Sequence, residues 1–138
     1  MFEHCLYFNT NALARRLDRE WVRAFKPFDL TPPQAFMLRA ILNKPGLLQW
    51  ELAKEMGISR PTATRSIDGL VMKQLIERKD SDRDGRESCV VPLQAALDLH
   101  QCLDAASGEV TRRLKNLLGV DVFVETVGKI RDVRTVMD

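Results

Sequence analysis

The middle of the chain carries two short helical patterns that are separated by only three residues. Apolar residues recur at helical spacing over 49–56 and again over 60–74. Between them, Gly57 suits the left-handed backbone position that ends a helix, and Ser59 suits the N-cap of the helix that follows. Two helices joined by so short a turn are typical of a helix-turn-helix. Any fold for this chain must therefore accommodate that unit.

A change of hydrophobic period follows the second helical pattern. Residues 79–87 are polar around Asp84-Gly85, a strong hairpin-turn signal, and 88–91 have the composition of a strand. The sequence therefore predicts a two-stranded β-ribbon directly after the helix-turn-helix, which is a wing.

Longer helical patterns flank this central region. One is expected from residue 2 to about 26, and two more fill 94–138, where Asp121 is predicted to cap the last. A shorter helix is expected after Thr31, whose side chain suits an N-cap, with Gln34 placed to close a capping box. The flanking apolar faces exceed what a compact helix-turn-helix needs, and such surplus faces often pair with a second copy.

The predicted fold is mainly α with a small β wing, a winged helix-turn-helix with terminal dimerisation helices. Residues 1–138 are expected to form a single domain, with the winged helix-turn-helix core at 30–93 and dimerisation helices at 1–28 and 94–138. A length of 138 residues fits one domain of this kind.

Composition and motifs exclude several classes of protein. No apolar run is long enough for a membrane span, and the N-terminus lacks a signal-peptide pattern, so a cytoplasmic location and no membrane partner are expected. Three cysteines without CxxC spacing exclude a zinc ribbon, and no metal or cofactor site is predicted. No phosphate loop, paired carboxylate or nucleophile motif is present, so the chain is not predicted to be an enzyme.

Residues 30–93 resemble the MarR family of bacterial winged helix-turn-helix transcriptional regulators. Four pieces in order carry the resemblance: Leu30-Thr31-Pro32-Pro33-Gln34, the stretch from Glu51 to Arg60, the stretch from Leu70 to Arg78, and Asp84-Gly85-Arg86. The chain departs from the family pattern at Leu48, where a Thr or Ser cap is common. It departs again at Gln74, where Gly is usual between recognition helix and wing. Both departures touch element boundaries rather than positions expected to face DNA.

The second helix of the motif contains short hydroxyl side chains and two arginines, with no acid between 59 and 67. A helix that enters the major groove reads base edges from its N-terminal half, and its hydroxyls and arginines also hold phosphates. The residues expected to contact DNA from this helix are Ser59, Arg60, Thr62, Ala63, Thr64 and Arg65. Because the net charge of the chain is only +2, the prediction of DNA binding depends on where these arginines lie and not on the total charge.

On the predicted wing, Arg83, Asp84 and Arg86 are the expected DNA-binding residues. The resemblance implies that Arg86 enters the minor groove and that Asp84 orients it. A narrow minor groove concentrates negative potential, which attracts a guanidinium group.

The resemblance implies a homodimeric repressor that binds a pseudo-palindromic operator in double-stranded DNA. It also implies release by a small molecule, often aromatic, lodged between the dimerisation and DNA-binding parts. Oxidation of Cys5 is a second candidate signal, although a buried or inert thiol is the simpler interpretation. The alternative function is a winged-helix protein-interaction module without an operator, which the low overall charge favours.

Overall fold

The computed structural model describes residues 1–81 and 87–138. In chain order the elements are α1 (Leu6–Phe25), the 3-10 helix η1 (Lys26–Phe28), α2 (Pro32–Asn43), β1 (Leu47–Leu48), α3 (Gln49–Met56), α4 (Arg60–Met72), β2 (Ile76–Asp80), β3 (Ser88–Pro92), α5 (Gln94–Leu118) and α6 (Val120–Met137). The mainly helical fold with a small β wing is confirmed. Within the described ranges no helix combines the length and the apolarity needed to cross a membrane.

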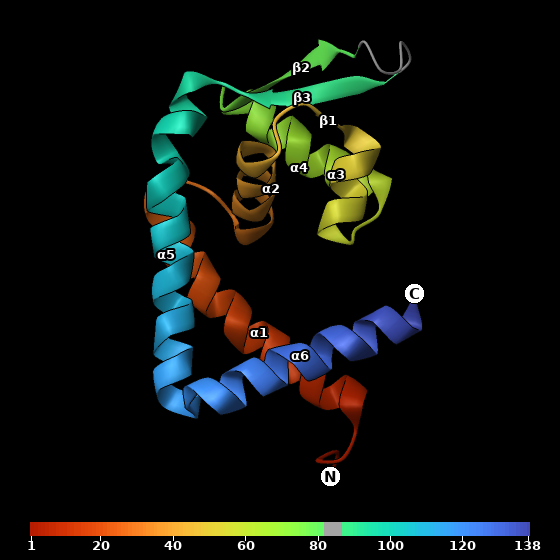
Figure 1. Cartoon of the computed structure of the whole chain (residues 1–138), viewed down its shortest axis with the longest axis vertical. Coiled ribbons are helices and arrows are strands. Elements are labelled where there is room, and N and C mark those ends of the chain that lie inside the picture. The colour runs from red at the N-terminus through yellow and green to blue at the C-terminus, as the bar shows by residue number, and fades with distance from the viewer. Residues whose placement is uncertain (82–86) are drawn as a thin grey trace.

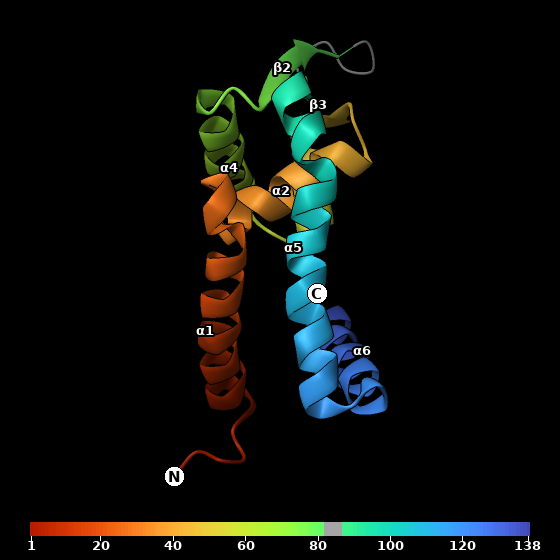
Figure 2. The same cartoon turned by 90° about the vertical axis from the view of Figure 1, so that its left-hand side faces the viewer.

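The long helix α5 forms one side of the molecule and connects its two ends (Figure 1). The helix-turn-helix and the strands lie at the end where α5 begins, and α6 turns back from the end where α5 finishes. The helices α1 and α6 cross in Figure 1, but Figure 2 shows them on opposite sides of α5. The helix-turn-helix and α6 therefore lie at opposite ends of α5.

The helix α2 begins as the sequence predicts. Thr31 is its N-cap and accepts a hydrogen bond from the Gln34 backbone N–H, while Gln34 Oε1 accepts from the Thr31 backbone N–H at 3.2 Å. This reciprocal capping box satisfies two donors that a helix start otherwise leaves free. Pro32 lies in the first turn, where a backbone N–H has no acceptor within the helix, so its missing N–H costs no hydrogen bond.

The hydrophobic core surrounds α2, which the other elements cover. Met37, Leu38 and Ile41 of α2 are fully buried, together with apolar residues of every neighbouring element. The buried partners include Phe25, Leu52, Ile67, Leu70, Ile76, Val90 and Leu103. Because these side chains come from α1 through α5, the core fixes the helix-turn-helix against the long helix.

The predicted two-stranded ribbon is confirmed in the antiparallel pairing of β2 with β3, and β1 adds a third strand that was not predicted, in the order β1-β3-β2. The extra strand is only two residues long, and it pairs Leu47 with Val90 and Leu48 with Cys89. Two residues are too few to show the alternation that marks a strand in sequence. The pairing anchors the wing to the start of α3.

Three helix boundaries differ from expectation. The helix α1 begins at Leu6 and not at residue 2. The helix α4 ends at Met72 and not near Gln74, because Gln74 takes a left-handed φ of 60° that turns the chain toward β2. The predicted cap of α6 is also wrong: α6 begins at Val120 with Gly119 at the cap position, and Asp121 lies within the first turn. Gly119 has a φ of 86°, which permits the sharp change of direction between α5 and α6.

Candidate nucleic-acid interface

The turn between α3 and α4 sets the direction of α4. Gly57 has a φ of 65°, the left-handed conformation that glycine adopts without steric cost. The Gly57 and Ile58 N–H groups donate to the last carbonyls of α3, with Ile58 N at 3.0 Å from the Ala53 oxygen. These bonds complete the end of α3 and let α4 start three residues later.

The first turn of α4 is organised by hydroxyl groups. Ser59 is the N-cap and accepts a hydrogen bond from the Thr62 N–H at 3.3 Å, as predicted. The Ser59 hydroxyl donates to Thr62 Oγ1 at 2.9 Å, and the Arg65 guanidinium donates to the same oxygen at 3.3 Å. Ser59, Thr62 and Arg65 therefore form one connected group at the start of the helix.

The predicted contact residues of α4 do not all face solvent. Ser59, Arg60, Thr64 and Arg65 are exposed, and Thr62 is half-buried. Ala63 is only 1% exposed and packs in the hydrophobic core, so its prediction as a DNA-facing residue is wrong. Helical rotation explains the difference, because Ala63 lies on the same side of α4 as the buried Ile67 and Leu70.

The strands β2 and β3 of the sheet form the base of the wing, and β2 contacts α4. Residues of β2 and β3 pair in antiparallel register from Ile76 with Pro92 to Asp80 with Ser88. The predicted wing residues Arg83, Asp84 and Arg86 lie outside the described residues. The structure describes the paired strands β2 and β3 that precede and follow them in the chain.

Three residues of this region were missed at the sequence level: Gln49, Asp68 and Arg78. Arg78 of β2 donates from Nε to Gln49 Oε1 at 2.9 Å and from a terminal nitrogen to Asp68 Oδ1 at 2.5 Å. Asp68 lies one turn beyond Thr64 and is exposed on α4. Its spacing from Arg60 and Thr64 was visible in the sequence, but the partner on β2 was not.

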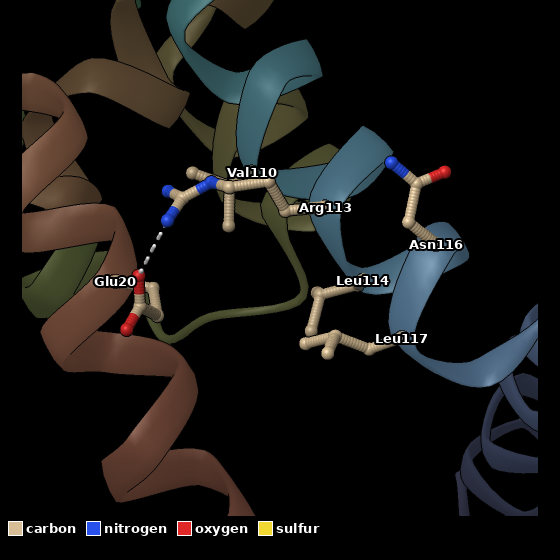
Figure 3. Close-up of a pocket in the computed structure, with 6 residues that line it drawn as sticks. All are labelled: Glu20, Val110, Arg113, Leu114, Asn116 and Leu117. Carbon is tan, nitrogen blue, oxygen red and sulfur yellow. Dashed lines mark ion pairs between the residues drawn. The ribbon is translucent and has the colours of Figure 1, made fainter.

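A hollow of about 380 Å³ lies between α1 and α5 (Figure 3). Val110, Leu114 and Leu117 of α5 supply its apolar wall. Glu20 of α1 and Arg113 of α5 point toward each other across it, with 3.5 Å between Oε2 and the guanidinium nitrogen. The hollow thus combines apolar surface with an ion pair between two helices.

The cysteines of the chain are all reduced thiols in the structure. Cys5 and Cys102 are exposed, and Cys89 on β3 is half-buried. Cys5 occupies the N-cap position of α1. In the part of the chain that the structure describes, no group of three or more His, Cys, Asp or Glu residues is placed to hold a metal ion.

Comparisons with known proteins agree with this architecture. Residues 28–87 match the model described as the MarR family. The uncharacterized HTH-type transcriptional regulator YybA of Bacillus subtilis is 30% identical over 91 residues, which cover 66% of this chain and 61% of YybA. The chain therefore matches less than two thirds of the length of this relative.

Solved structures extend the likeness over nearly the whole chain. The MepR–DNA complex of S. aureus has a TM-score of 0.86 at 18% identity and covers 96% of this chain and 98% of its own. The PcaV transcriptional regulator of Streptomyces coelicolor, in complex with its natural ligand, has a TM-score of 0.81 at 23% identity, with full coverage of both chains. At these identities the structures show a shared fold.

The sequence match and the fold converge on one assignment. The matched residues 28–87 contain α2, α3, α4 and β2, the elements that build the helix-turn-helix and the base of the wing. The shared fold adds the long terminal helices on either side. The resemblance to the MarR family is therefore confirmed: residues 28–87 match the family model, and the chain is similar over 91 residues to an HTH-type transcriptional regulator.

Proposed function

We propose that the protein is a sequence-specific DNA-binding transcriptional regulator that acts as a homodimeric repressor. The observation that carries the proposal is the exposed N-terminal half of α4, where Arg60, Thr64 and Arg65 share the solvent face. No acidic residue lies between 59 and 67, so this face can approach phosphates. Of the predicted contacts we retain Ser59, Arg60, Thr62, Thr64 and Arg65 on α4, with Arg83, Asp84 and Arg86 on the wing.

The ordered hydroxyl group at the start of α4 supports this role. Thr62 Oγ1 accepts hydrogen bonds from both Ser59 and Arg65, which limits the positions open to the Arg65 guanidinium. A guanidinium held at the N-terminal end of a recognition helix can reach a guanine edge or a phosphate. Preorganisation of this kind reduces the entropy lost on binding.

A binding assay over a salt series tests the proposal. A duplex selected from a random library by the purified protein serves as the operator. We expect Arg65→Ala and Arg86→Ala each to weaken operator binding by about 1 to 3 kcal/mol. If the arginine that is removed contacts a phosphate, the slope of log affinity against log salt concentration should also become shallower by about 1. Arg112→Ala on α5 is the matched control, because Arg112 pairs with Glu109 away from α4.

The outcomes separate the two candidate functions. Affinity retained in both arginine variants would overturn the assignment of the contact residues. Failure to select any duplex, with binding that shows no sequence preference, would favour the protein-interaction module.

The terminal helices support a dimer. The helix α6 has no buried residue, and its apolar side chains are exposed except for the half-buried Phe123. The exposed apolar residues of α6 are Val120, Val122, Val124, Val127, Ile130, Val133, Val136 and Met137. Further exposed apolar residues are Phe2, which precedes α1, and Leu6, Tyr7, Phe8 and Leu13 of α1. Apolar surface of this extent is typical of an interface, and a second copy is the partner that a pseudo-palindromic operator requires.

Light scattering after size exclusion tests the dimer. We expect the wild-type protein to elute with twice the chain mass of 15.8 kDa and Ile130→Lys to shift it toward the monomer. Asp132→Lys is the matched control, because two residues along a helix reverse the face. A monomeric wild type would contradict the dimer, and equal effects of both variants would contradict the apolar face of α6 as its interface.

The hollow between α1 and α5 is the proposed effector site. Its apolar wall suits an aromatic ring, and Arg113 can pair with an acidic group that replaces Glu20. Benzoate and 4-hydroxybenzoate are the probes. We expect them to release the protein from operator DNA, with the effect lost in Arg113→Met and kept in Arg112→Met; release that is equal in both variants would exclude this hollow.

Oxidation at Cys5 is the second proposed signal, and the exposure of its thiol permits it. Treatment with hydrogen peroxide of the wild type and of Cys5→Ser distinguishes the two signals. Peroxide release that needs Cys5 would support oxidation, and identical release of both proteins would dismiss it.

A further inference from the structure

One side chain joins three elements at the base of the wing. The Arg78 guanidinium, which is 29% exposed, reaches from β2 to Gln49 at the start of α3 and to Asp68 on α4. The donor atoms differ, with Nε bonded to the amide oxygen and a terminal nitrogen bonded to the carboxylate. A planar guanidinium serves two such acceptors in fixed directions, which a lysine ammonium on a flexible stem does not.

The position of Asp68 gives this contact its meaning. Arg60, Thr64 and Asp68 are spaced by four residues and are all exposed, so Asp68 continues the row that contains the proposed DNA contacts. An unpaired carboxylate in that row would repel phosphates. Because Arg78 bonds to Asp68, the two charges offset each other, and the guanidinium is occupied within the protein.

The contact also adds to the link between recognition helix and wing. Residues 73–75 connect α4 to β2, and the Leu75 N–H donates to the Leu70 oxygen at 3.1 Å. Arg78 lies three residues further along β2, in register with Val90 of β3. Its bond to Asp68 therefore ties the strand to the middle of α4, beyond the turn itself.

We propose that Arg78 is a positioning residue that fixes the angle between β2 and α4 and thereby the distance between major-groove and wing contacts on the operator. The inference rests on the proposed DNA-binding function. Asp68 and Gln49 are the two acceptors through which Arg78 acts. Arg78 itself does not read bases or hold phosphates.

This role predicts that a substitution of Arg78 changes operator affinity more than it changes the free energy of unfolding. A partly exposed ion pair contributes at most about 1 kcal/mol to folding. Operator binding, by contrast, depends on two sets of contacts being made at once, and a small change of angle prevents one of them. Loss of the Arg78 hydrogen bonds to Gln49 and Asp68 should therefore reduce operator affinity with little change in melting temperature.

A double-mutant cycle with the wing tests the proposal. The full-length protein is compared with Arg78→Lys, Arg86→Ala and the double variant, by operator affinity and by thermal melting. We expect Arg78→Lys to weaken operator binding about tenfold and Arg86→Ala to cost less in that background than alone, because coupled residues show non-additive effects. The melting temperature of Arg78→Lys should stay close to that of the wild type.

The matched control breaks a similar ion pair elsewhere. Arg39 of α2 donates from Nε to Asp104 of α5 at 2.8 Å, and its side chain is 23% exposed. We expect Arg39→Lys to combine additively with Arg86→Ala. Additive effects of Arg78→Lys and Arg86→Ala, or a loss of affinity that follows a fall in melting temperature, would overturn the positioning role.

Asp68→Asn distinguishes positioning from direct contact. If Arg78 positions the wing, removal of the Asp68 charge should lower the ratio of operator to non-specific affinity, even though one negative charge is lost. If Arg78 instead holds a phosphate itself, Asp68→Asn frees it, and a rise in operator affinity would overturn the proposal. Absence of operator binding by the wild-type protein would refute the proposed function instead, so the two failures are separate.

Discussion

The indole N–H of Trp21 in α1 donates a hydrogen bond to the hydroxyl of Ser107 in α5, with 3.0 Å between Nε1 and Oγ. Ser107 is one of two buried polar residues among those described, and Trp21 packs against the hydrophobic core. The nearby ion pair of Glu20 and Arg113 links the same two helices at the edge of the proposed effector hollow. Trp21 and Ser107 therefore set how α1 lies along α5.

Substitution of Trp21 by Phe should measure this link. The Ser107 hydroxyl would lose its donor, and we expect a loss of about 1 kcal/mol beyond that caused by the smaller ring. Urea unfolding at fixed protein concentration gives the free energy. Ser107→Ala is the reciprocal variant, and the double variant should cost less than the sum of the two; exact additivity would show that the bond contributes nothing.

Gly69 on α4 should resist substitution by Ala although it lies within a helix. A Cβ at Gly69 would lie 2.7 Å from Gln34 Nε2, and Gln34 is held by its capping box with Thr31 and by Lys73, 3.3 Å from its Oε1. The gain of about 1 kcal/mol that Ala normally brings to a helix should therefore be absent.

The Gln34→Ala background removes the obstruction. There, Gly69→Ala should raise the free energy of unfolding by about 1 kcal/mol relative to Gln34→Ala alone. Equal effects of Gly69→Ala in both backgrounds, measured by urea unfolding, would show that the close approach to Gln34 costs nothing.

Gln74 marks a strained position between α4 and β2. Its φ of 60° is the left-handed conformation, which costs a residue with a Cβ roughly 1 kcal/mol relative to glycine. We therefore expect Gln74→Gly to raise the melting temperature, whereas Gln74→Ala, which keeps a Cβ, should not. A fall in melting temperature for the glycine variant would mean that the Gln74 side chain makes a contact worth more than the strain.

Acid should weaken one interaction on α5. The hydrogen bond from Arg112 holds the pKa of the Glu109 carboxyl below its ordinary value of 4.5. A carboxyl whose pKa is lower in the folded state contributes stability that is present above its unfolded pKa and is lost as the pH falls through the folded pKa. The melting-temperature difference between wild type and Glu109→Gln should therefore shrink below about pH 4.5.

Arg112→Gln provides the control for that titration. Without this hydrogen bond, the pKa of the Glu109 carboxyl should move toward its ordinary value, so adding Glu109→Gln in this background should produce a difference that depends less on pH. A difference that persists unchanged at acid pH in the wild-type background would contradict the assigned cause.

Local features of this protein were readable from the sequence. The capping box of Thr31 and Gln34, the Ser59 cap and the left-handed Gly57 were all predicted and are confirmed. Each depends on residues within four positions of one another, so short-range geometry determines them. The two central helices and the long α5 followed from hydrophobic periodicity for the same reason.

Contacts between distant residues required the tertiary structure. The pairing of β1 with β3 joins residues more than 40 positions apart, and the hydrogen bonds of Arg78 join β2 to both α3 and α4. Sequence order alone does not state which of many arginines meets which carboxylate. Ala63 shows the same limit, because its place in α4 was predictable but its burial depends on how α4 packs in the core.

The sequence by itself thus determined the caps of α2 and α4 and which segment forms the helix-turn-helix, but not the start of α1, the end of α4 or the cap of α6. The tertiary structure decided which side of α4 faces solvent, which residues hold the wing against it and which apolar faces remain uncovered on α6. The physical reason is range: capping and periodicity act within one or two helical turns, whereas packing and ion pairing depend on elements that meet only after the chain has folded.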